Sequence, residues 1–169
     1  MKPLTLVALC LFTFSISHAQ DNFSVPELTQ DQAQEVLYAH VFSYAVSGIS
    51  YAKSMGSTPE AYGNYVGKLF TPWWDPSAGL PGFANQMMFI LAGIHPDNEM
   101  EIMAQDENSI RFRMKNVDLS FKQGPMFGVS YDDFLEFSSE LLVVLADFLS
   151  LDFKDSFVDG WYEVSLKAR

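Results

Sequence analysis

The chain has 169 residues, of which 49% are hydrophobic and 15% aromatic, and 10 Lys and Arg against 21 Asp and Glu give a net charge of -11. The apolar content argues against a disordered chain. The acid excess argues against binding of nucleic acid or anionic lipid headgroups, which requires clustered basic side chains. The length predicts one globular domain with at most a short tail.

Residues 1–19 have the pattern of a secretory signal peptide. Lys2 supplies the positive charge, an apolar run over residues 4–14 follows, and Ser17 and Ala19 fit the small positions of a cleavage site. We therefore expect a single globular domain over residues 20–169, with no stable membrane anchor after cleavage. The only cysteine, Cys10, would leave with the signal, and a disulfide-free exported domain is typical of a bacterial periplasmic or secreted protein.

Three helices are predicted next. Thr29 and Gln32 form a capping box for a helix that ends near Gly56, a second helix follows over residues 58–70, and a third covers residues 83–92. The first helix is apolar nearly all round, which is typical of a central helix. Its strongest stripe contains Ala33, Val36, Leu37, His40, Val41, Tyr44, Ala45, Gly48, Ala52 and Met55.

Two glycines on the second helix and two tryptophans in the loop that follows it are notable. Gly63 and Gly67 are four apart on the second helix, a spacing that lets another backbone approach closely. The loop over residues 71–82 holds Trp73 and Trp74 between prolines and glycines. These two rings would form either a lid over a pocket or a plug at the edge of the core.

A β-hairpin is predicted over residues 99–115, because apolar residues alternate on both arms. Met100, Ile102 and Ala104 would share one face with Ile110, Phe112 and Met114 of the partner. For these residues to share one face, the numbers of two directly facing residues must add up to an even number. A loop that joins such strands has an odd number of residues, so we expect a three- or five-residue loop within 105–109. The same register sets Glu101 against Arg113 or Lys115 on the outer face.

The C-terminal part is predicted to hold a long fourth helix and one last strand. Ser130 begins the helix, which runs to about Leu149, and Asp159 and Gly160 mark a turn before a strand over residues 161–167. The fold class expected is α+β, with three N-terminal helices, an antiparallel hairpin, a long helix and a C-terminal strand. The small antiparallel sheet would be covered by helices on one face.

The motifs for common enzymes and cofactors are absent, so no catalytic residue, metal or cofactor is predicted. Ser50 and Lys53 match the S-x-x-K of serine acyl-enzymes, but the companion K-T-G is missing, and a solvated pair is the simpler interpretation. Carboxylates four apart on the fourth helix lie opposite its apolar face, as a solvated row does. This row is Asp132, Glu136 and Glu140.

The segment before the hairpin offers one metal-binding alternative. His95, Asp97 and Glu99 alternate, and in an extended chain they would project to one side and could hold a divalent cation. A polar turn entering a strand explains the same residues, since Pro96 and Asn98 favour turns.

Six residues are the candidates for ligand binding. His40 lies on the apolar stripe, where it is either a core histidine satisfied by a tyrosine or carbonyl, or, with Tyr44, a polar point in an apolar cavity. Methionines adapt to irregular apolar surfaces, in a pocket or in a core. The candidate ligand-binding residues are His40, Tyr44, Trp73, Trp74, Met87 and Met88.

The element order of the C-terminal half resembles the vinyl-reductase-type sensor domain, a family of small-molecule sensors. The hairpin EMEIMAQDENSIRFRMKN, the helix GVSYDDFLEFSSELLVVLADFLSLDF and the strand DGWYEVSL carry the resemblance over residues 99–168. It implies an α+β fold with a hydrophobic ligand cavity. The cysteines of that family are missing here, so no metal or redox role is implied.

Three functions are consistent with these patterns. The first is a non-enzymatic exported protein that binds an apolar or aromatic small molecule, or an acyl chain, in a helix-lined cavity. The second is an interaction protein that buries the same surfaces against a partner or in a homodimer, for which Val143 and Trp161 are suitable. The third is a metal-assisted hydrolase that uses His95, Asp97 and Glu99.

Overall fold

The computed structural model describes residues 29–92 and 98–169, of which Gln34–Arg169 form one compact unit. The predicted signal peptide lies outside the described residues, as do His95 and Asp97. The helices are α2 (Gln30–Ser54), α3 (Pro59–Phe70), η1 (Thr71–Trp73), η2 (Pro76–Ala78), α4 (Gly79–Ala92), η3 (Leu119–Phe121) and α5 (Tyr131–Phe148). The strands are β1 (Met100–Gln105), β2 (Ser109–Lys115), β3 (Leu151–Val158) and β4 (Trp161–Ala168).

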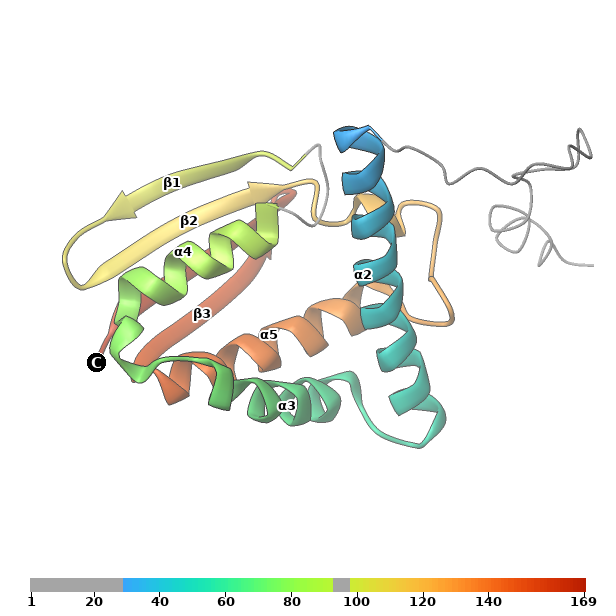
Figure 1. Ribbon diagram of the computed structural model, residues 1–169, viewed down its shortest axis with the longest axis horizontal. Helices are drawn as coiled ribbons and strands as arrows, with labels where there is room; N and C mark the ends of the chain where they lie inside the picture. Colours follow the sequence, from blue (N-terminus) through green and yellow to red (C-terminus); the bar gives the residue numbers. More distant parts are fainter. Residues whose placement is uncertain (1–28, 93–97) are drawn as a thin grey trace, which may run out of the picture. The chain divides into compact units, whose positions relative to one another are not determined.

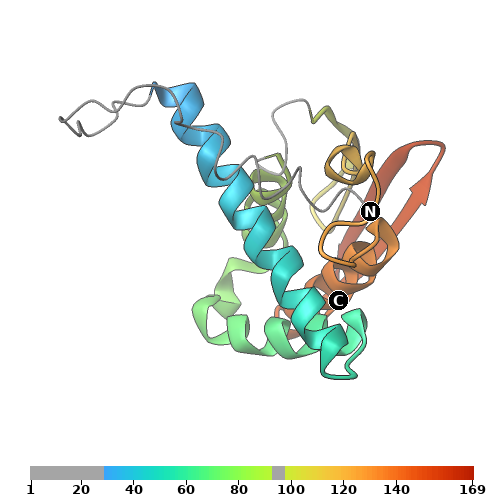
Figure 2. The ribbon, with the colours of Figure 1, turned by 90° about the vertical axis from the view of Figure 1, so that its right-hand side faces the viewer.

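The predicted α+β class is confirmed, with helices on one face of an antiparallel sheet (Figures 1 and 2). The four strands lie in the order β1-β2-β4-β3. Inward side chains of β2 and β4, such as Phe112 and Leu166, are fully buried against α4 and α5. A second apolar cluster joins α2 to α5 and contains Phe42, Val46, Ile49 and Phe137.

Strand β3 is missing from the sequence-based prediction. Its inward positions pair with those of β4, and the third of them is Asp155, which faces Val164. The carboxylate accepts hydrogen bonds from Ser139 Oγ at 2.8 Å and from Tyr162 Oη at 2.7 Å. These donors satisfy the buried side of a charged group in the sheet. Because Asp155 interrupts the apolar alternation expected of a strand, the sequence pattern did not indicate β3.

The β1–β2 hairpin corrects the predicted loop length. Glu101 pairs with Arg113 and Ile102 with Phe112, which are even sums, and the Glu101–Arg113 ion pair is confirmed at 2.7 Å. A register shift between Ile102 and Ala104 then leaves Met103 as an extra residue. Gln105 faces Ile110, an odd sum, so the loop has even length and the prediction of three or five residues is wrong. The bulge also turns Ala104 to the outer face, opposite Arg111.

Helix α3 lies against α5 because two glycines remove the side chains between them. A Cβ added to Gly63 would lie 2.3 Å from the Phe137 carbonyl oxygen, and one on Gly67 would lie 2.8 Å from the Val144 Cβ. The close approach predicted from their spacing is therefore present.

The predicted buried face of α2 is wrong. Phe42, Val46 and Ile49 are buried, whereas Leu37 and Tyr44 are exposed. Apolar residues cover most of this helix, so periodicity alone could not identify the face that meets α5. Nor is α2 covered on several sides over its described residues.

Within the described ranges, no helix combines the length and the apolar composition needed to cross a membrane.

Candidate functional site

A largely apolar cavity of about 660 Å³ lies between α2, η1, α4 and α5. This volume is in the range of small-molecule binding sites. The lining residues are Tyr38, Val41, Phe42, Ala45, Phe70, Trp73, Trp74, Asp75, Gly82, Phe83, Gln86, Met87, Ile90, Leu91, Phe134, Phe137, Ser138, Leu141, Leu142 and Leu145.

The cavity has a buried floor and an exposed rim. Phe83 and Met87 of α4 are almost fully buried and belong to the core against the sheet. Phe42 and Phe137 belong to the second cluster, so the cavity lies between the two cores. On the rim, Trp73 is 86% exposed. A ligand in the cavity could therefore contact buried apolar side chains on the floor and exposed aromatic ones on the rim.

Few polar groups line the cavity. Tyr38 makes a hydrogen bond to Ser120, and burial raises the pKa of its phenol, despite that bond, so the group stays neutral. Asp75 accepts hydrogen bonds from the Ser77 backbone N and the Ser77 Oγ, both at 2.8 Å, and these lower its pKa. Asp75 is thus an anion at neutral pH, and it is the one charged residue among the described lining residues.

Three of the six predicted ligand-binding residues line this cavity, namely Trp73, Trp74 and Met87. Trp74 packs edge-to-face on Phe83 with 5.3 Å between ring centroids, which makes it a plug at the core edge. Met88 is half-buried against the main core and does not line the cavity.

The prediction that His40 and Tyr44 bind a ligand in the cavity is wrong. Both are exposed, Tyr44 by 75%, and neither lines the cavity. Their rings lie near each other, with centroids 6.3 Å apart. The prediction of a buried histidine failed because His40 lies on the exposed side of α2, whereas Val41 and Ala45 of the same predicted stripe line the cavity. Tyr38 and Phe42, which lie off that stripe, complete the α2 part of the wall.

Residues of α5 form the wall that sequence reasoning missed. Phe134, Leu141 and Leu142 line the cavity together with Ser138, although the sequence pattern places the first three on one wide apolar face of the helix. Their signal is the width of that face, since a helix that packs on a sheet and also borders a cavity needs apolar residues over more than one stripe.

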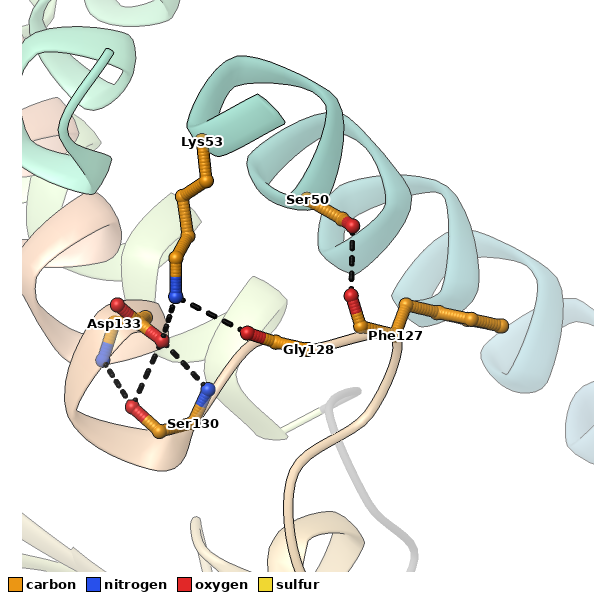
Figure 3. Close-up of polar contacts among 6 residues, drawn as sticks. All are labelled: Ser50, Lys53, Phe127, Gly128, Ser130 and Asp133. Atoms are coloured by element: carbon orange, nitrogen blue, oxygen red, sulfur yellow. Dashed lines mark hydrogen bonds and ion pairs between the residues drawn. The ribbon is translucent and has the colours of Figure 1, made fainter. Parts of the chain in front are cut away.

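Ser50 and Lys53 are not the solvated pair of the simpler interpretation, because both side chains bond to a distant segment of the chain (Figure 3). Ser50 Oγ donates to the Phe127 carbonyl oxygen at 2.7 Å. Lys53 Nζ donates to the Gly128 carbonyl oxygen at 3.1 Å and to Asp133 Oδ2 at 2.6 Å. These bonds attach the end of α2 to the loop that precedes α5 and to the first turn of α5.

Asp133 is the centre of this polar cluster (Figure 3). Its Oδ2 also accepts from the Ser130 backbone N at 2.7 Å and from Ser130 Oγ at 2.9 Å, which completes the capping box of α5. Burial alone would raise the pKa of Asp133, but the hydrogen bonds from Lys53 and Ser130 lower it overall.

The predicted solvated row of carboxylates on α5 is exposed at two of its three positions. Asp132 and Glu136 are exposed, and Glu140 accepts from Asn64 Nδ2 at 2.7 Å. The Glu99 carboxylate lies 3.7 Å from Lys115 Nζ, across the open end of the β1–β2 hairpin. Among the described residues, no group of three His, Cys, Asp or Glu side chains is placed to hold a metal ion.

Comparison with protein families, curated proteins and solved structures finds no match to the chain. The resemblance to the vinyl-reductase-type domain therefore stays a prediction.

Proposed function

We propose that the protein is exported and binds an apolar or aromatic small molecule, or an acyl chain, without catalysing a reaction. The observation that carries this proposal is the cavity between α2, η1, α4 and α5, with a volume of about 660 Å³ and a lining dominated by aliphatic and aromatic side chains. Burial of a ligand's apolar surface supplies the binding energy, at about 25 cal/mol per Å².

Chain length should control affinity if the ligand lies along the cavity. Each buried methylene contributes about 0.8 kcal/mol, so two more carbons should tighten binding roughly tenfold. The gain should stop when the cavity is full. A series of primary alcohols, measured by displacement of the neutral probe N-phenyl-1-naphthylamine, should therefore reach a plateau, whereas adsorption to an open surface should give a continuous rise.

A wall substitution separates cavity binding from surface binding. Ala45 lines the cavity, while Ala39 is exposed on the same helix and does not. Ala45→Trp should lower probe affinity at least about tenfold, because the indole takes ligand volume. Ala39→Trp adds the same ring outside the cavity and should keep the affinity of the unaltered protein. Equal affinities for the two variants would contradict the proposal.

An interaction function is the alternative, and the exposed apolar face of α2 favours it. Leu37, Val41 and Tyr44 are exposed there, and Val41 also lines the cavity. Exposed apolar surface of this kind is typical of binding sites for proteins as well as for ligands. Native mass spectrometry distinguishes the two functions, since a bound organic molecule adds a few hundred daltons to the monomer and self-association doubles the bare mass.

A further inference from the structure

The charge of the cavity rim limits the ligands that the proposed cavity would accept. Asp75 lies between η1 and η2, on a short connection that begins next to Trp73 and Trp74. Two hydrogen bonds from Ser77 hold its carboxylate, so it stays ionised and in place. The nearest basic residue along the chain, Lys68, is exposed on α3 and does not line the cavity.

The other polar groups of the lining are neutral. Gln86 and Ser138 can donate and accept hydrogen bonds, and Tyr38 carries a phenol. An amphiphile with a hydroxyl or amine at one end can therefore be satisfied there. A carboxylate or phosphate would meet one fixed anion and no cation among the described lining residues, in a protein of net charge -11.

On the basis of the proposed function, we infer that the cavity selects amphiphiles with an uncharged or cationic polar end and rejects anionic ones such as free fatty acids, and that Asp75 sets this preference. The occupant would be an alcohol, an amide, an ester or an amine with a medium-length apolar body. Because Asp75 is on the rim, its effect is that of one charge in a largely aqueous medium, about fivefold for each unit charge at low ionic strength.

The test compares three ligands that share one apolar chain. Decan-1-ol, decylammonium and decanoate are titrated against N-phenyl-1-naphthylamine bound to the purified protein at low salt and pH 7. Decylammonium and decan-1-ol should displace the probe at concentrations at least about fivefold lower than decanoate. The gap between the two ions should shrink at 0.5 M salt, since screening weakens an exposed charge.

Two variants assign the effect to one residue. Asp75→Asn keeps the side-chain oxygen that accepts from Ser77 and removes the charge. The ratio between the concentrations of decanoate and decylammonium that displace the probe should therefore fall about tenfold or more. The concentration of decan-1-ol that displaces the probe should not change. Asp159→Asn removes the same charge at the β3–β4 turn, where the positive φ of 50° suits asparagine, and should leave the gap unchanged.

The possible results separate the proposed function from the preference for charge. If the probe and all three ligands fail to bind, the proposed function falls and this inference falls with it. If they bind without a preference for charge, or if Asp75→Asn changes the gap no more than Asp159→Asn does, the inference alone is overturned.

Discussion

The approach of α3 to α5 gives the sharpest test of the fold. Gly63 is buried at this interface, and a Cβ there would lie 2.3 Å from the Phe137 carbonyl oxygen. An ordinary contact needs about 3.5 Å, so Gly63→Ala requires the helices to separate locally by about 1 Å. The contacted atom is backbone, and no rotamer change can relieve the clash.

The magnitude follows from two opposing terms. Replacing glycine by alanine inside a helix stabilises it by about 1 kcal/mol. A 1 Å separation forfeits a quarter to a half of the dispersion energy of the affected contacts, and overpacking of this kind costs about 3 kcal/mol when the backbone must move. We expect a net loss of about 2 kcal/mol in the free energy of unfolding, and a fall of about 4–8 °C in Tm.

The control is the same substitution in α2. A Cβ on Gly48 would meet the Tyr62 hydroxyl at 2.5 Å, which is the far end of a side chain and not backbone. Gly48→Ala should therefore remain within about 1 kcal/mol of the unaltered protein. Urea unfolding followed by circular dichroism measures both variants. If Gly63→Ala is as stable as Gly48→Ala, the close contact between α3 and α5 is refuted.

Three further substitutions test the polar contacts. Tyr162→Phe should cost about 1–2 kcal/mol, because it removes the donor to the Asp155 carboxylate, whereas Tyr131→Phe should be neutral or stabilising, because the Tyr131 hydroxyl is buried without a partner among the described residues. Thermal unfolding at pH 7 compares these two, and equal losses would contradict the assignment. Asp133→Asn should lower the free energy of unfolding by about 1–2 kcal/mol at pH 7. The folded pKa of Asp133 is lowered, so its contribution is complete above the unfolded value of about 3.9 and is lost as the pH falls through the folded value. Urea unfolding at pH 7 and near pH 2 should show the deficit disappear in acid, and a deficit that is constant with pH would refute the role of the charge.

The predictable part of the fold was the part with local signals. The capping box of Thr29 and Gln32 and the cap of α5 by Ser130 are both present, because these bonds form between residues three apart. The Asp159 turn is present for the same reason, with positive φ at both central residues.

The failures depend on contacts between distant segments. Strand β3 was not predicted because the charged Asp155 interrupts its apolar alternation, and the donors that satisfy this carboxylate, Ser139 and Tyr162, belong to other elements. The length of the hairpin loop was deduced on the assumption of an unbroken pairing register between β1 and β2. The extra residue at Met103 interrupts that register, so the predicted length is wrong.

The site was predictable in kind and only partly in detail. An apolar cavity was one of the hypotheses drawn from the sequence, and Trp73, Trp74 and Met87 of its candidate residues line the cavity in the structure. His40 was assigned to the wrong environment because a helix with apolar residues around most of its circumference gives no direction to its core. The α5 residues that line the cavity are those that face α2 across it. The spacing of apolar residues within α5 does not show which of them face α2, so these residues could not be identified from the sequence.

The bulge at Met103 has a consequence for how copies of this chain meet. Strand β1 is an edge of the sheet, and from Glu101 onward its side chains are exposed, so its free backbone groups could pair with a strand from another molecule. An extra residue in the middle of the strand interrupts the even spacing of those groups and increases the local twist. A straight strand cannot align with such an edge over its full length. The extra residue at Met103 therefore works against edge-to-edge pairing of β1 with a strand of another copy of this chain.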